Sequence, residues 1–243
     1  MTVQQDRSPV RTRLLAAGGA LLVGIAGASA QDANVRVFHA SPDTPEVIIN
    51  VNEGAAQVGP LAFGNTTGYI PLAPGDYRFQ VAAAAAPMDF VIDIAPTLEA
   101  GVDYSVFAIN TLANIEPLVL VDDNTSVAGQ ARFRVLHLNT DAPTVDLNVR
   151  GGPTLATLSF TDVSDYLSVA PGTYDLDLNL AGTDTTALAL DGITLLDGYV
   201  YTVVAFGGVN EPLSVGLFVD AIPAPGSMAL LAVAGVFASR RRR

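Results

Sequence analysis

The sequence predicts an all-β protein of two tandem immunoglobulin-like or transthyretin-like β-sandwich domains, with an N-terminal signal helix and a short C-terminal apolar helix. Three observations lead to this prediction. Apolar and polar residues alternate along short segments, turn residues separate these segments, and the whole pattern occurs twice at an offset of 97 or 98 residues. Alternation with a period of two is typical of strands that bury one face.

Residues 1–30 have the features of a secretory signal peptide. Three arginines between positions 7 and 13 precede an apolar stretch, residues 14–27, that is too short and too glycine-rich for a stable membrane span. Small residues ending at Ala30 predict cleavage before Gln31. A non-cleaved anchor is the alternative. We therefore expect the protein to be exported.

The middle of the chain contains two copies of one module. The first copy, residues 31–123, opens with residues 35–45, and the second copy, residues 131–221, opens with the matching residues 133–143. Residues 124–130 between them are polar and form the expected linker. Matches at so constant an offset indicate a duplicated unit.

Each copy consists of short predicted strands. Residues 174–180 alternate strictly, so Tyr and Leu are expected to face inward and Asp and Asn outward. Further strands are expected at residues 47–49, 77–81, 90–94, 104–109, 145–149 and 199–206. The Pro-Gly pairs at 74–75 and 171–172 fit the central positions of type II turns. Roughly seven short strands per copy predict a β-sandwich.

The C-terminal tail, residues 222–243, has three parts. Pro223 and Pro225 interrupt regular structure, residues 228–238 are almost wholly apolar, and a cluster of arginines follows. The cluster is Arg240, Arg241, Arg242 and Arg243. This order resembles the PEP-CTERM sorting signals of Gram-negative bacteria, with Pro-Ala-Pro in place of Pro-Glu-Pro. The resemblance implies processing by an exosortase-like membrane enzyme and at least transient anchoring in the membrane.

The modules resemble one family of bacterial secreted domains. Residues 39–45 read His-Ala-Ser-Pro-Asp-Thr-Pro, and the second copy keeps His137, Asp141 and Pro143. Together with the Pro-Gly-x-Tyr segments and the Glu-Pro-Leu endings, this opening is similar to that of the domain of unknown function 4397 (DUF4397). The resemblance implies an exported β domain, often in tandem, and it brings no established activity.

Charge excludes a role with nucleic acid. The chain has 12 arginines and no lysine, and seven of those arginines lie in the two ends. Asp6 is the one acidic residue in those ends, so five arginines face 23 acidic residues in the middle, a net charge of −18. Such a surface repels phosphate, because nucleic-acid binding needs clustered Lys and Arg. Solubility in salty surroundings and attraction of cations are two interpretations of this charge.

The two histidines are candidate metal ligands. His39 lies four residues before Asp43, and His137 lies four residues before Asp141. Zinc needs three or four converging ligands, and one His per module supplies few of them. The alternative is a structural His whose ring bonds the Asp or the loop backbone. We therefore predict no metal site and no cofactor.

Three further hypotheses have weaker support. Ser41 beside His39 could serve as a nucleophile, but Asn139 occupies the matching position of the second copy. Residues 122–124 could hold calcium, although an acidic solvated linker fits their spacing better. Matched tyrosines could line a glycan-binding face or belong to the core. They are Tyr69, Tyr77 and Tyr104 in the first copy and Tyr166, Tyr174 and Tyr201 in the second.

These features predict a non-catalytic structural or adhesive protein at the cell surface or in the extracellular matrix. Its two sandwiches are expected to follow one another like beads. Expected partners are the processing enzyme, extracellular polysaccharide or surface proteins, and the membrane through the tail. A glycan- or partner-binding module that uses residues 39–45 and 137–143 is the first alternative, and a metal-dependent enzyme is the second.

Overall fold

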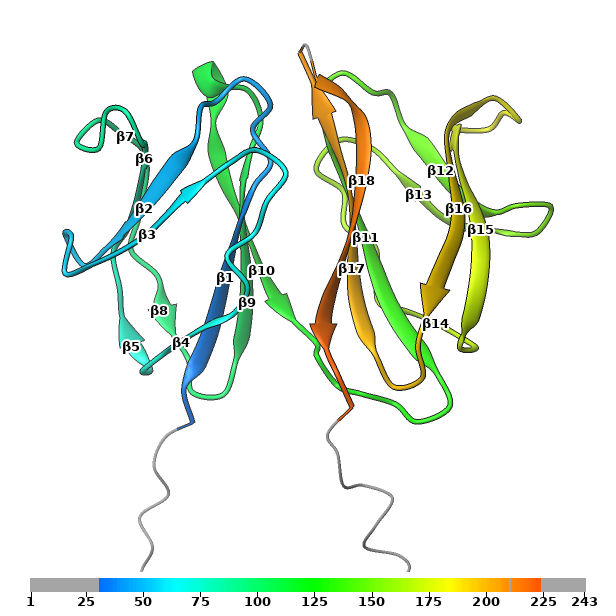
Figure 1. Cartoon of the computed structure of the whole chain (residues 1–243), viewed down its shortest axis with the longest axis horizontal. Coiled ribbons are helices and arrows are strands. Elements are labelled where there is room, and N and C mark those ends of the chain that lie inside the picture. Colours follow the sequence, from blue (N-terminus) through cyan, green and yellow to red (C-terminus); the bar gives the residue numbers. More distant parts are fainter. Residues whose placement is uncertain (1–30, 210, 224–243) are drawn as a thin grey trace, which may run out of the picture.

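Two β-sandwiches lie side by side in the computed structural model, which describes residues 31–209 and 211–223 (Figure 1). The first sandwich extends from residue 33 to residue 122 and the second from 131 to 221. The prediction of two tandem all-β sandwiches is confirmed. The expected signal helix and C-terminal helix lie outside the described residues.

The first sandwich has two four-stranded sheets and a small two-stranded one. The sheet that faces the second sandwich, here called the inner sheet, has the order β10-β9-β1-β4, and the outer sheet has the order β3-β2-β6-β7. The strands are β1 (Ala33–His39), β2 (Val47–Val51), β3 (Ala56–Leu61), β4 (Ile70–Leu72), β5 (Gly75–Asp76), β6 (Phe79–Ala83), β7 (Phe90–Ile94), β8 (Thr97–Leu98), β9 (Asp103–Ile109) and β10 (Glu116–Asp122). A short 3₁₀ helix, η1 (Leu112–Asn114), joins β9 to β10.

The second sandwich repeats this arrangement. Its inner sheet has the order β14-β11-β17-β18 and its outer sheet β13-β12-β15-β16. The strands are β11 (Ala131–Asn139), β12 (Val145–Val149), β13 (Thr154–Leu158), β14 (Leu167–Val169), β15 (Gly172–Leu180), β16 (Thr186–Leu195), β17 (Val200–Gly208) and β18 (Glu211–Ala221).

The strand order distinguishes the two sandwich classes that the sequence predicted. In the first inner sheet β1 pairs in parallel with β9 and antiparallel with β4. In the second, β11 pairs in parallel with β17 and antiparallel with β14. An immunoglobulin domain places its first two strands in one sheet, whereas β1 and β2 lie in opposite sheets. The order fits the transthyretin-like alternative.

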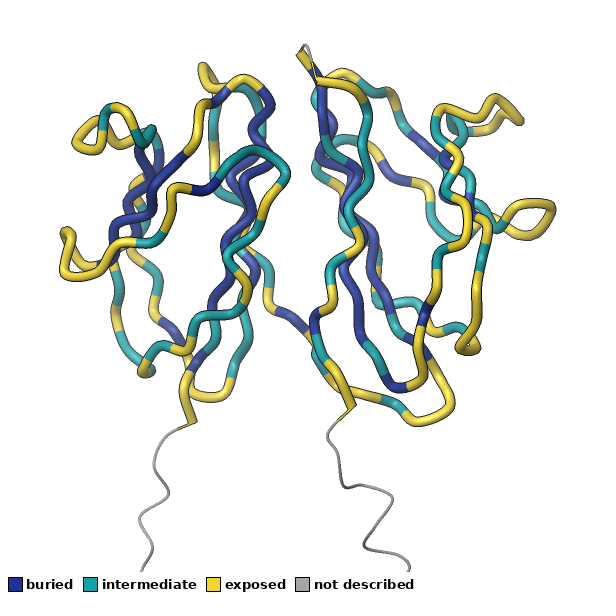
Figure 2. The backbone as a smooth tube through the Cα atoms, viewed as in Figure 1, coloured by how far each residue is buried: buried dark blue, intermediate teal, exposed yellow. Residues whose placement is uncertain are grey.

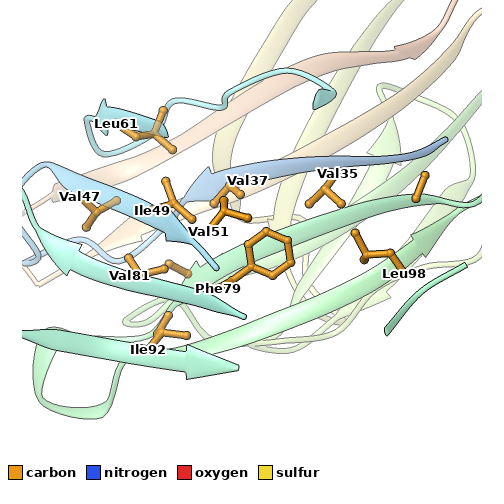
Figure 3. Packing of buried hydrophobic residues seen from close by; sticks show 12 residues of the cluster. Val35, Val37, Val47, Ile49, Val51, Leu61, Phe79, Val81, Ile92 and Leu98 are labelled. Carbon is orange, nitrogen blue, oxygen red and sulfur yellow. The ribbon is translucent and has the colours of Figure 1, made fainter. Parts of the chain in front are cut away.

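The alternating strands bury their apolar residues between the two sheets of each sandwich. In the first sandwich the inward residues of β2 and β6, such as Ile49 and Val81, meet Val35 and Val37 of β1 (Figure 3). Leu147 and Leu178 occupy the corresponding core of the second sandwich. The inward positions of residues 174–180 are therefore as predicted, with Leu176 and Leu178 buried. Burying such side chains contributes about 1.5–3 kcal/mol each relative to leaving them exposed.

The prediction of two matching type II turns is wrong. A type II turn needs a φ near +80° at its second central residue. Gly75 has a φ of +147° and begins β5, while Gly172 begins β15 and is not among the glycines with positive φ. In both copies the strand starts at this glycine, so the chain is already extended where the turn was expected.

The two sandwiches pack closely against each other, which corrects the expectation of beads on a string. β1 and β11, which belong to the facing inner sheets, are buried along nearly their whole length (Figure 2). A third apolar cluster lies between these sheets and includes Phe38 and Phe107 of the first sandwich and Leu136 and Val204 of the second. Strands β1, β9, β11 and β17 are thus covered on both faces, by the core on one side and by the other sandwich on the other.

Candidate functional site

Each predicted histidine braces the loop that follows its strand. His39 Nε2 lies 3.0 Å from the carbonyl oxygen of Pro45, and His137 Nε2 lies 3.1 Å from that of Pro143. The other ring nitrogen, Nδ1, accepts a hydrogen bond from the backbone N–H two residues later, at Ser41 or Asn139. Because a carbonyl only accepts, the hydrogen on each ring belongs on Nε2.

The matching aspartates tie the same loop to a second one. Asp43 Oδ1 accepts a 2.6 Å hydrogen bond from Leu112 N–H at the start of η1. Asp141 Oδ2 accepts a hydrogen bond of the same length from the N–H of Val209, which directly follows β17. The repeated His-x-x-x-Asp spacing therefore holds two loops together at the end of each sandwich.

The geometry does not bring metal ligands together at these positions. No group of three or more His, Asp or Glu side chains placed to hold a metal ion occurs within residues 31–209 and 211–223. Both nitrogens of each ring already contact backbone groups. The Ser41 hydroxyl bonds Thr44 Oγ1 at 2.5 Å rather than the His39 ring. It is therefore not placed as the nucleophile of a Ser-His pair.

Burial lowers the pKa of His39, and its hydrogen bonds to backbone groups of Pro45 and Thr44 only partly oppose this effect. His39 is thus neutral when folded at pH values where the unfolded chain already binds a proton. The contribution of His39 to stability is complete above about pH 6.5, the pKa of the unfolded chain, and is lost as the pH falls from there through the lower pKa of the folded state.

We expect the urea midpoint of the protein to fall between about pH 7.5 and about pH 5, and to fall less in His39→Gln. The variant removes the titrating ring while retaining a polar side chain. Equal pH dependence of the two proteins in chemical denaturation would contradict the assignment of this slope to His39.

The interface between the sandwiches contains a buried charge network that the sequence did not reveal. Arg36 on β1 donates from Nε to Ser105 Oγ at 2.7 Å and from Nη2 to Thr202 Oγ1 at 3.1 Å. Its Nη1 forms an ion pair with Asp220 Oδ1 at 2.8 Å. Arg36 is only 2% exposed. An arginine of the first sandwich therefore pairs with a carboxylate of the second.

The second sandwich makes the reciprocal contacts. Arg134 on β11 donates from Nε to Thr202 Oγ1 at 3.1 Å and forms a short ion pair with Asp122 of β10. Ser105 Oγ donates to Asp122 Oδ2 at 2.6 Å, and Thr202 Oγ1 donates to Asp220 Oδ2 at 2.5 Å. Two arginines thus face two carboxylates in a nearly two-fold arrangement.

Aromatic rings cover the network. The Arg36 guanidinium lies 4.6 Å from the ring centre of Tyr69, and that of Arg134 lies 5.2 Å from the ring centre of Tyr166. Burial raises the pKa of Tyr166 to about 12 and also raises that of Tyr69. Burial likewise raises the pKa of Asp220, against the opposing effect of Arg36. The network is thus held away from water between the two sandwiches.

These positions correct two details of the sequence interpretation. Asp122 is not part of a solvated acidic linker, because it ends β10 and is buried against Arg134. Tyr69 and Tyr166 lie at the interface, whereas Tyr77 and Tyr104 pack on the first core. Tyr174 and Tyr201 pack on the second core.

A signal for the interface was present in the sequence. Arg36 and Arg134 lie 98 residues apart, and the residues on the same strand face, Phe38 and Leu136, are apolar where a wet face would be polar. Strands that are apolar on both faces are typical of sheets covered on both sides.

The family of the chain follows from a comparison with family models. The model of a domain of unknown function, DUF4397, matches residues 33–148 and 141–234. The chain belongs to the DUF4397 family. The resemblance in the opening motifs is thereby confirmed. No curated protein matches this DUF4397 protein.

Solved structures give weak similarities. A candidate cell adhesion protein of Bacteroides fragilis matches 80% of this chain and 99% of its own, with 9% identity and a TM-score of 0.21. A leucine-rich repeat protein of Bacteroides thetaiotaomicron matches 75% of this chain, with 12% identity and a TM-score of 0.19. The match spans 26% of that second protein.

The remaining predicted site residues lie at or beyond the limits of the described chain. Gln31 is described, and its carbonyl accepts a hydrogen bond from Gly101 N–H at 3.1 Å. Pro223 is exposed just after β18. Ala30, Pro225 and Arg240 to Arg243 lie outside the described residues. None of the helices found in the described part of the chain has the length and apolarity of a membrane span.

Proposed function

We propose that this DUF4397 protein is an exported cell-surface or extracellular-matrix protein with a structural or adhesive role, and that it is not an enzyme. One observation carries the proposal. β1 begins and β18 ends at the same end of the sandwich pair, and the braced loops after β1 and β11 lie at the opposite end (Figure 1). A chain held by one of its termini would present these loops outward.

The interlocked sandwiches support a mechanical role. Sandwiches joined only by a flexible linker move independently, whereas apolar contacts and crossed ion pairs fix their relative position. The two loop ends then form one presenting surface of constant shape. Such a surface suits the display of contacts to a matrix or to a neighbouring cell.

The proposal assigns partners to the two ends. An exosortase-like membrane enzyme would process the tail after Pro223, and the membrane would hold the chain before processing. Extracellular polysaccharide or surface proteins would contact the outward end. The net charge of −18 between the two terminal segments supports the absence of nucleic acid among the partners.

Cell fractionation tests this role. We expect the full chain, expressed in a bacterium that has an exosortase, to be found in the envelope and to be cleaved by protease added to intact cells. A variant lacking residues 224–243 is expected in the medium, and one lacking residues 1–30 in the cytoplasm. Full-length protein that remains in the cytoplasm and is protected from protease would contradict the proposal.

A loop-mediated binding module is the second candidate. The loops at residues 39–45 and 137–143 lie at one end of the pair, as that alternative requires. The metal-dependent enzyme receives no support from the backbone contacts of His39 and His137.

A further inference from the structure

The outer sheet of the first sandwich contains a groove of about 300 Å³ on the face opposite the core. Its floor includes Asn50 of β2 and Gln80 of β6, which are directly opposite each other in the strand register. Gln57 and Arg78 line its sides, and Met88 and Phe90 border it near β7. This volume lies at the lower end of the range of small-ligand sites.

The floor offers one unused donor and one unused acceptor. Gln57 Nε2 donates to Asn50 Oδ1 at 2.9 Å, and Gln80 Nε2 donates to Asp93 Oδ2 at 3.0 Å. Asn50 Nδ2 and Gln80 Oε1 have no hydrogen-bond partner among the described residues, and neither is among the buried polar atoms sealed without one. Asn50 and Gln80 are only 7% and 5% exposed, so these two atoms have access chiefly to the groove.

This pair of atoms complements a hydroxyl group. A hydroxyl both donates and accepts, so it can bond Gln80 Oε1 and Asn50 Nδ2 together. Cross-strand neighbours have Cβ atoms about 5 Å apart, which places their polar ends within reach of one ligand oxygen. Polar groups at such burial are ordinarily satisfied, and a ligand hydroxyl would satisfy both.

One side of the groove is apolar and exposed. Met88 is 77% exposed and Phe90 is 37% exposed, and neither is among the buried residues of a core. An aromatic face beside polar groups suits a ligand whose own faces alternate between C–H and O–H groups. Large exposed apolar side chains next to convergent polar atoms are typical of binding surfaces.

Charge favours a neutral ligand. Arg78 donates from Nε and Nη2 to the two carboxylate oxygens of Asp93 at 2.9 and 2.7 Å, and from Nη1 to Glu53 at 2.8 Å. The hydrogen bonds from Arg78 and, next, from Gln80 lower the pKa of Asp93 to about 2. The charge of Arg78 is therefore matched by the carboxylates of Asp93 and Glu53. The excess negative charge of the chain repels polyanions further.

We propose that this groove binds a neutral polysaccharide. One sugar hydroxyl bridges Asn50 Nδ2 and Gln80 Oε1, and the C–H face of a sugar ring packs on Phe90. The proposal deepens the adhesive role, and it rests on that role for the setting in which the protein meets polysaccharide.

The corresponding groove of the second sandwich provides an internal control. It is larger, about 420 Å³, but no aromatic residue or methionine lines it. On its floor Asp146 accepts from Thr157 and from Gly182 N–H, and Asn148 Oδ1 accepts from Thr154. Asn179 Oδ1 is buried there without a partner among the described residues, so the two grooves differ chiefly in the aromatic side that the second one lacks. We therefore assign saccharide binding to the first groove.

Affinity electrophoresis of the purified full chain in gels containing glucan, mannan or galactan tests the assignment, with alginate as the anionic comparison. We expect at least one neutral polymer to retard the protein. Asn50→Asp keeps the acceptor for Gln57 and removes the donor, so it should weaken binding about tenfold, as should Phe90→Ala. Asn148→Asp, the matched change in the second groove, should leave binding unchanged.

Three outcomes would overturn the proposal: no retardation by any neutral polymer, retardation by alginate alone, or wild-type binding by both groove variants. Thermal unfolding of each variant checks its fold, and Phe90→Ala decides if Asn50→Asp does not fold. If the protein binds polysaccharide but is confined to the cytoplasm, the surface role is contradicted and saccharide binding by the groove is retained. If the protein reaches the surface but binds no polysaccharide, saccharide binding is contradicted and the surface role is retained.

Discussion

Replacing Arg36 with methionine is expected to lower the free energy of unfolding by about 3–5 kcal/mol. The substitution removes the cation that pairs with Asp220 and leaves that carboxylate buried at the interface, 8% exposed. An uncompensated buried charge costs more than the ion pair itself contributes, because the lost solvation is no longer offset. Urea denaturation monitored by circular dichroism measures the difference.

A second substitution separates the charge effect from a packing effect. Adding Asp220→Leu to Arg36→Met removes the orphaned carboxylate and should restore much of the lost stability. Arg150→Met serves as the matched control, because Arg150 pairs with Asp177 and Asp191 on the exposed outer sheet. Arg150→Met should lower the free energy of unfolding far less than Arg36→Met does. Equal losses for the two single variants would show that burial of the network does not matter.

The strands of each sandwich could be predicted from the sequence because the alternation that identifies a strand lies within a few neighbouring residues. A period of two assigns each residue of a strand to the core or to the outside, so Leu176 and Leu178 were placed correctly. The duplicated opening also located His39 at the end of β1, whereas His137 lies two residues before the end of β11. Their backbone partners, Pro45 and Pro143, lie only six residues away, within the loop that the motif itself spans.

The packing of the two sandwiches could not be predicted in the same way. The contact between Arg36 and Asp220 joins residues 184 positions apart in different modules, and no local period records it. The groove was missed for a related reason. Asn50 and Gln80 occupy outward positions of two strands, and the pattern does not show that neighbouring segments rise around them.

Replacing Phe107 with alanine is expected to cost about 3–5 kcal/mol and to uncouple the two sandwiches. Phe107 is fully buried, and its ring stacks on that of Phe38 with centroids 4.4 Å apart. Both rings belong to the cluster between the inner sheets, so the resulting cavity lies at the interface.

Differential scanning calorimetry distinguishes this effect from simple destabilisation. Sandwiches that stabilise each other through a shared apolar cluster unfold in one cooperative transition, and a weakened cluster allows each to unfold at its own temperature. We therefore expect one transition in the wild type and two in Phe107→Ala. Phe90→Ala makes the same chemical change on the outer sheet, away from the interface, and should keep one transition with a small shift. A single transition in Phe107→Ala would show that the crossed ion pairs of Arg36 and Arg134 are sufficient to couple the sandwiches without the rings.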